Sequence, residues 1–300
     1  MRILLLLLAL SLTSPNLWAQ VRITPSRVYT QAIMISKEIN LLKRHFKLKA
    51  IKPYRNIKAD LRPRHAWQKS YALLVKINVL RKKNNLPRFT VNSIEPVLNL
   101  DPLLTFEQTQ RILTELRILK TRLGIRKKIS PTKEVFGKEP IDVFNQLHRV
   151  SLQMEVLNHE AINPTYVFAE VLRIYEDITL IASEKLVEDN SFPPEKLKEL
   201  TPKNSLLAAF ELMAEIQEIQ KTLGIERSNF TPFMKDKNVL PSDVFNMVGM
   251  CLAELQTIKA HMEISNLTLP AEYQEEKSPA DVHQLLLWSL RKLHLVHLER

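Results

Sequence analysis

Apolar residues recur along this chain in alternating steps of four and three residues. In one stretch that begins at Pro140 they are Val143, Leu147, Val150, Met154 and Leu157. In a second stretch that begins at Pro241 they are Val244, Val248, Cys251, Leu255 and Ile258. Such spacing places the apolar residues on one face of an α-helix, as in the seam of a coiled coil. Each stretch therefore predicts a helix of about 20 residues, roughly 30 Å long.

The same pattern occurs eight times, and each copy begins with a proline. The prolines are Pro25, Pro63, Pro102, Pro140, Pro164, Pro202, Pro241 and Pro279. Their spacings are 38, 39 and 38 residues, then 24, and then again 38, 39 and 38. A set of spacings that repeats in this way indicates internal duplication. We predict an all-α fold made by tandem duplication of a four-helix unit, with an offset of 139 residues.

Residues that favour the start of a helix surround these prolines. Good N-cap residues precede five of them: Thr24, Asp101, Asn163, Thr201 and Ser278. Proline suits the first helical position, where its missing N–H is not needed. In three copies an aspartate stands at the third helical position, where its negative charge interacts favourably with the positive end of the helix dipole: Asp142, Asp243 and Asp281. We therefore expect each helix to begin at its proline.

Charged residues within the pattern bear on helix direction. An acidic residue stands 13 positions after the proline in five copies: Glu38, Glu115, Asp177, Glu215 and Glu254. A basic residue stands 18 positions after it in four copies: Lys43, Arg81, Lys120 and Lys259. A separation of five residues suits ion pairs between parallel neighbouring helices rather than within one helix.

We therefore favour parallel helices joined by long return segments of about 15 residues, which reach roughly 50 Å when extended. The alternative is an antiparallel bundle with short helices inside the connections, for example at 194–200, because long structureless loops are uncommon. The two halves form a helical bundle, packed as a pseudo-twofold pair, or stack as a short solenoid.

The first 19 residues have the features of a signal peptide. Arg2 is followed by an apolar run from Ile3 to Leu10, and Ala19 offers a small residue for cleavage. We thus divide the chain into a signal peptide (1–19, removed), a first half (20–161) and a second half (162–300). The one cysteine, Cys251, excludes an intrachain disulfide. A large exported protein without disulfides fits the bacterial periplasm best, and the extracellular space is the alternative.

Charge divides unevenly between the halves. Residues 20–161 hold 28 Lys and Arg against 11 Asp and Glu, a net charge of +17, whereas residues 162–300 hold 14 against 21, a net charge of −7. Such a field attracts anionic partners. The predicted partner-binding residues are Lys43, Arg44, Lys47, Lys49, Lys52, Tyr54, Arg55, Lys58, Arg62, Arg64, Arg81, Lys82, Lys83 and Arg88. A second basic cluster is Arg126, Lys127 and Lys128.

The expected partner is an acidic protein or the periplasmic domain of a membrane protein, with an anionic glycan or lipid headgroups as alternatives. Nucleic acid is disfavoured, because an exported protein rarely meets it. Tyr54, Trp67 and Phe89 lie among the basic residues and are candidates for stacking on sugar rings, although Trp67 occupies a core position of the pattern.

Candidate chemistry is sparse. Four glycines do not build a glycine-rich phosphate site, and Cys251 alone makes no redox motif or cysteine zinc cluster and occupies a core position. His294 and His297 share one face of the last helix, but His283 is roughly 16 Å away and no third ligand is apparent. We therefore expect no metal, no cofactor and no catalytic residue. The leading hypothesis is a non-enzymatic exported binding or scaffold protein; a carrier or sensor of an anionic polysaccharide or small ligand is second, and an unrecognised enzyme is third.

Overall fold

The computed structural model describes residues 22–49, 56–91, 100–158, 162–188, 190–268, 270 and 273–298, and the predicted signal peptide lies outside these ranges. Within them the fold is all-α, as predicted, and every helix begins at one of the eight prolines. The helices are α2 (Pro25–His45), α3 (Pro63–Lys83), α4 (Pro102–Arg122), α5 (Pro140–Asn158), α6 (Pro164–Glu184), α7 (Pro202–Thr222), α8 (Pro241–His261) and α9 (Pro279–Leu298). One 3₁₀ turn, η1 (Thr231–Phe233), lies between α7 and α8.

The helix starts have the capping interactions that their sequences predict. The backbone N–H groups of Leu240 and Ser278 donate to the carboxylates of Asp243 and Asp281, at 2.8 Å and 2.9 Å. At α4 the Asp101 side chain accepts from the N–H of Leu103. These contacts satisfy donors that a helix start leaves unpaired, and they position the first core residue one turn later.

The helix ends are repeated as faithfully as the starts. A residue with positive φ stands 22 positions after the proline in six copies: Lys47, Asn85, Gly124, Leu186, Gly224 and Glu263. After α4, the Gly124 N–H donates to the Thr121 carbonyl and the Ile125 N–H donates to the Lys120 carbonyl, at 3.1 Å and 2.9 Å. This pair of bonds ends the helix and turns the chain, and glycine adopts the required backbone conformation without strain.

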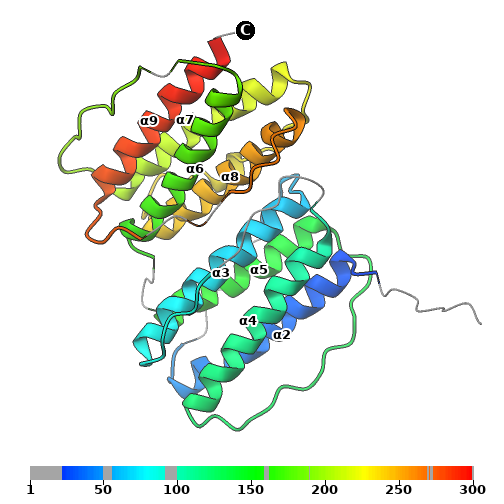
Figure 1. Cartoon of the computed structure of the whole chain (residues 1–300). Helices are drawn as coiled ribbons and strands as arrows, with labels where there is room; N and C mark the ends of the chain where they lie inside the picture. Colours follow the sequence, from blue (N-terminus) through cyan, green and yellow to red (C-terminus); the bar gives the residue numbers. More distant parts are fainter. Residues whose placement is uncertain are drawn as a thin grey trace, which may run out of the picture.

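Helices α2–α5 pack together as the N-terminal unit, and α6–α9 pack together as the C-terminal unit (Figure 1). All four helices of a unit run in the same direction, because the prolines that open them surround one small pocket at one end of the unit. The prediction of parallel helices is therefore confirmed. The antiparallel alternative is wrong, and segment 194–200, proposed for a short helix, is not helical.

Ion pairs across the helix seams follow the predicted positions. Lys120 of α4 donates to Glu38 of α2 at 2.5 Å, and Lys259 of α8 donates to Asp177 of α6 at 2.7 Å. Going around each unit, the neighbours are α2, α4, α3, α5 and then α2 again, and α6, α8, α7, α9 and then α6 again. The chain thus crosses the unit from α2 to α3 and from α4 to α5, and likewise from α6 to α7 and from α8 to α9, whereas α3 lies next to α4 and α7 lies next to α8.

The two units contact each other through α3 and α8. His65, near the start of α3, bonds to Glu254 in the second half of α8 at 2.8 Å, whereas Lys69, further along α3, donates to Asn246 near the start of α8 at 2.7 Å. The two helices therefore run antiparallel, which places the helix dipoles of the two units in opposition. Under the 139-residue offset α3 corresponds to α7, so the contact joins non-equivalent helices and is not the symmetric contact of a pseudo-twofold pair.

The core contains the residues that the pattern assigns to it. Trp67 is 2% exposed and Cys251 is fully buried, so neither side chain is presented to a partner. Burial raises the pKa of the Cys251 thiol well above its usual range, which keeps it protonated and unreactive. Among the helices that the structure describes, none combines the length and the apolar character needed to cross a membrane.

Candidate functional site: the basic end of the N-terminal unit

Parallel packing brings the C-terminal ends of α2, α3 and α4 together at one end of the N-terminal unit. Basic side chains follow each of these helix ends onto the surface. We define the basic end by its exposed members: Arg44, Lys47, Lys49, Lys82, Lys83, Arg88, Arg122, Arg126, Lys127 and Lys128. Residues that are dispersed over some 85 positions of sequence therefore form one surface.

Helix dipoles explain only part of this accumulation. Four parallel helices leave about half a negative charge at each C-terminal end, and basic residues stabilise such ends. The described last turns of the N-terminal unit hold seven Lys and Arg residues, whereas those of the C-terminal unit hold two. Because the C-terminal unit has the same four parallel helices and forms with far fewer basic residues, folding alone does not require the excess.

A groove of about 730 Å³ opens beside the ends of α2 and α4. Its walls include Arg117, whose side chain is 54% exposed, and the segment from Arg126 to Lys128. The Lys120 side chain donates to the Lys127 carbonyl at 2.8 Å and holds this segment against α4. The carboxylate in the groove, that of Glu38, is buried and paired with Lys120, so the accessible charge of the wall is positive.

Eight of the predicted partner-binding residues come together at this end, but two of them are not accessible. Lys43 and Arg81 are buried, at 6% and 8% exposure, and the predicted role for both is corrected here. Arg81 forms an ion pair with Glu115 and donates to the Pro87 carbonyl, which ties the connection after α3 to its helix. Burial lowers the pKa of Lys43. Both side chains stay inside because they stand at core-facing positions of the repeat.

The remaining predicted residues lie elsewhere. Lys58, Arg62 and Arg64 are near the start of α3, at the opposite end of the unit. Arg62 donates to the Glu226 carbonyl at 2.7 Å and pairs with its carboxylate at 3.2 Å, so it joins the two units rather than meeting a partner. Lys52, Tyr54 and Arg55 lie outside the described residues.

The aromatic candidate near the basic end has partners inside the protein. The ring of Phe89 lies 5.5 Å from the guanidinium of Arg81 and 4.7 Å from that of Arg111. Cation–π contact with two arginines engages this ring within the N-terminal unit. We therefore assign Phe89 to anchoring the connection after α3 instead of to stacking on a sugar.

A second group of titratable side chains lies in the contact between the units. Lys69 is 1% exposed, and burial lowers its pKa to about 7. His148 is beneath the same contact, and burial followed by the charges of Lys69 and Lys76 lowers its pKa well below the usual range. This arrangement resembles the tuning seen in catalytic sites. However, Lys69 donates to Asn246 in the packed contact, so the arrangement serves packing between the units.

One cluster escaped the sequence argument. His294 and His297 do have a third potential ligand, because Glu215 of α7 faces them from the neighbouring helix. The repeat contains the signal, since Glu215 stands 13 and His297 stands 18 positions after their prolines. The pattern does not tell which helices pack side by side, and α7 borders α9 although α8 separates them in sequence. The expectation that the histidine pair lacks a third ligand is therefore wrong.

Comparison with models of protein families, with curated proteins and with solved structures yields no significant match.

Proposed function

We propose that this protein is a non-enzymatic binding or scaffold protein, exported to the periplasm, which docks an acidic protein through its basic end. One observation carries the proposal: the N-terminal unit concentrates basic residues at its helix ends, and the equally parallel C-terminal unit does not. The periplasmic domain of a membrane protein is a partner of the required kind. Signal-peptide features at residues 1–19 support export.

The geometry favours an extended acidic partner over a compact ligand. The exposed basic residues come from three helix ends and the segments that follow them, and the groove lined by α2, α4 and the segment after α4 adds a depression to this surface. A positive surface of this breadth accelerates encounter with an acidic surface and orients it. The groove is also the one observation that favours the second candidate, a carrier of an anionic envelope polysaccharide.

Charge reversal at the basic end tests the proposal. The test variant replaces Arg122, Arg126, Lys127 and Lys128 by glutamate, all of which are exposed. The matched control replaces Lys185, Lys198, Lys203 and Lys237, exposed residues of the C-terminal unit, by glutamate, so that the change in net charge is identical.

Each tagged protein is used to capture partners from an envelope extract at low and moderate salt. We expect the parent and the control to retain one stoichiometric acidic protein, and the test variant to lose it. Equal retention by the test variant and the control would refute docking at the basic end. Retention of polysaccharide alone, released as salt rises, would favour the second candidate.

A further inference from the structure

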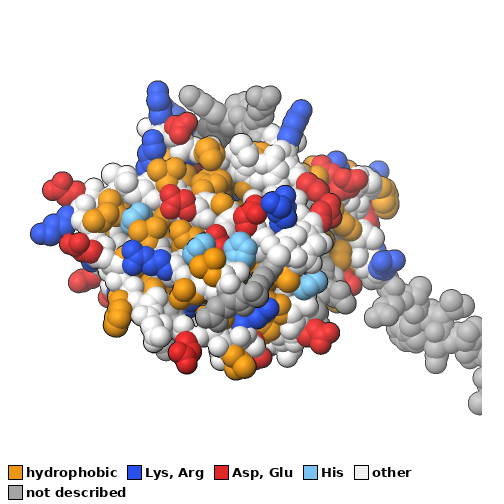
Figure 2. Space-filling view, turned by 90° about the horizontal axis from the view of Figure 1, so that it is seen from above, with side chains coloured by type: hydrophobic (Ala, Val, Ile, Leu, Met, Phe, Trp, Pro, Cys, Tyr) orange, Lys and Arg blue, Asp and Glu red, His pale blue; other side chains and the backbone are white. Residues whose placement is uncertain are grey.

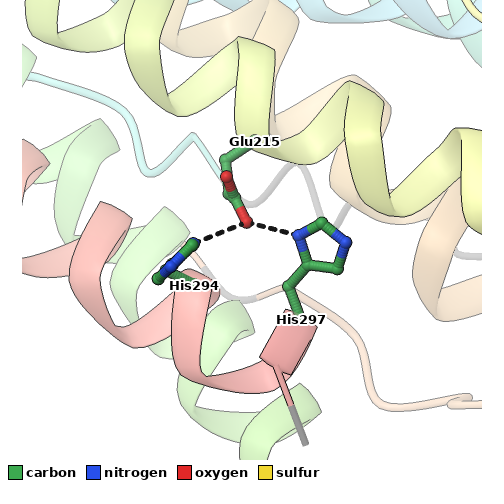
Figure 3. Close-up of side chains that lie close together, drawn as sticks. All are labelled: Glu215, His294 and His297. Carbon is green, nitrogen blue, oxygen red and sulfur yellow. Dashed lines mark hydrogen bonds and ion pairs between the residues drawn. The ribbon is translucent and has the colours of Figure 1, made fainter. Parts of the chain in front are cut away.

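Three side chains with metal-binding groups converge where α7 borders α9. The Oε1 atom of Glu215 lies 3.2 Å from Nδ1 of His294 and 2.7 Å from Nδ1 of His297 (Figure 3). One ligand atom from each of the three side chains lies within 4.8 Å of the other two. The two histidines are three residues apart on one face of α9, and Glu215 approaches from α7.

These distances suit a small divalent ion. Zinc binds imidazole nitrogen and carboxylate oxygen at about 2.0–2.2 Å, so two ligands of a tetrahedral site are separated by about 3.3 Å. The two separations from Glu215, 3.2 Å and 2.7 Å, are near this value, and all three ligand atoms lie within 4.8 Å of one another, so side-chain rotation can bring them around one ion. Two imidazoles and one carboxylate are also the ligand types that zinc and neighbouring transition metals prefer.

We propose that Glu215, His294 and His297 bind a divalent transition-metal ion, with Zn²⁺ as the probe ion. The side chain of His294 is 55% exposed and that of His297 is 28% exposed. Histidine side chains are visible among acidic and apolar ones on the face of the molecule seen from above (Figure 2). The site is thus open to solvent, which leaves its fourth coordination position for water or for a ligand from a partner.

Other seams of the protein explain why a cation belongs here. At the junction of α2 with α4 the acid Glu38 is paired with Lys120, and at the junction of α6 with α8 Asp177 is paired with Lys259. At the junction of α7 with α9 the acid is kept, but imidazoles replace the basic side chains. A bound metal ion supplies the positive charge that lysine supplies in the other seams.

The duplicated copy of this junction has no such site. Under the 139-residue offset the three positions correspond to Lys76, Glu155 and Asn158. There the Lys76 side chain donates to Glu155 at 2.6 Å, so an ordinary ion pair closes the seam. The metal-binding set is therefore specific to the C-terminal unit, and the expected stoichiometry is one ion per chain.

Calorimetric titration of ZnCl₂ into the untagged, chelator-treated chain without residues 1–19 tests the proposal. We expect one saturable site per chain. Glu215→Gln and His297→Lys each alter a ligand, so each should weaken Zn²⁺ binding at least about tenfold, the smallest effect typical of changing a residue that supports the ligands of a metal site. The second variant is the sharper one, because a lysine at this position reproduces the seams of Lys120 and Lys259 while it removes a ligand. His283→Ala, in the same helix, is the matched control and should bind as the parent does.

Co²⁺ provides an independent spectroscopic readout. We expect visible d–d bands of a four- or five-coordinate ion in the parent and in His283→Ala, and their loss in His297→Lys. Circular dichroism verifies that each variant is folded. If a ligand variant does not fold, His294→Ala takes its place, because His294 is the most exposed of the three ligands. Absence of one-to-one binding, or binding that these ligand variants leave unchanged, would overturn the proposal and assign the cluster to hydrogen bonding alone.

Discussion

Removing the ion pair between Lys259 and Asp177 tests how contacts between parallel helices stabilise the C-terminal unit. The Lys259 side chain is fully buried, and its Nζ lies 2.7 Å from Oδ1 of Asp177, which is 4% exposed. Lys259→Met leaves the aspartate charge buried without a cation, a change that costs about 3–5 kcal/mol. Asp177 keeps hydrogen bonds from Gln256 and Thr268, both at 2.6 Å, so we expect a loss of about 3 kcal/mol, at the lower end.

Two further variants separate the buried charge from the loss of packing. Asp177→Asn combined with Lys259→Met removes both charges and keeps a side-chain oxygen, so we expect this double variant to recover most of the loss, to within about 1 kcal/mol of the parent. Lys221→Met breaks an exposed pair with Glu218, whose side chains are 63% and 50% exposed. That control should change stability by less than about 0.5 kcal/mol.

The two units carry their own fluorescence reporters. Beyond residues 1–19 the chain has two tryptophans, Trp67 in α3 and Trp288 in α9. Trp288 packs against Tyr175 at 4.6 Å between ring centroids and donates to Ser191, so its emission follows the C-terminal unit. Guanidinium unfolding in a Trp67→Phe background then measures the C-terminal unit alone. A loss for Lys259→Met no larger than that of the control, or no recovery in the double variant, would show that the buried pair does not stabilise the C-terminal unit.

Three further predictions concern a core position, a helix end and a carboxylate in the contact between the units. Val143→Asp and Val244→Asp each place an unpaired charge at a position 2% or 1% exposed, so each should unfold its own unit, and melting curves like that of the parent would contradict the seam assignment. Leu186→Gly should stabilise the chain by about 0.5–1 kcal/mol in thermal unfolding, because glycine suits the φ of 56° after α6 and the leucine is 88% exposed. Burial alone would raise the pKa of Glu254, but hydrogen bonds led by that from His65 hold it below its ordinary value. Its contribution to stability is therefore present above about pH 4.3 and is lost as pH falls through the lowered pKa, so Glu254→Gln should flatten the acid limb of the stability curve.

Much of the basic end was predictable, and its limits have a physical cause. Charge counting placed the excess in the first half, and the parallel packing explains why its members meet. Exposure was not predictable, because Lys43 and Arg81 occupy the positions that face a neighbouring helix. A basic residue at such a position pairs inside the seam, as Arg81 does with Glu115, and does not reach a partner.

The amino-acid sequence was enough to place the start of each helix and its buried face, and the spacing of acidic and basic residues favoured parallel helices over the antiparallel alternative. The helix starts depend on capping contacts within the first turn after each proline. The helix direction was inferred from a repeated spacing instead, because the pair that this spacing predicts, Glu38 with Lys120, joins two helices 82 residues apart in sequence. The packed structure was needed to establish which helices are neighbours, how α3 packs on α8, and that Glu215 faces His294 and His297. Every helix of the repeat carries nearly the same seam, so several orders satisfy the local pattern, and the choice among them depends on packing and charge summed over the whole unit.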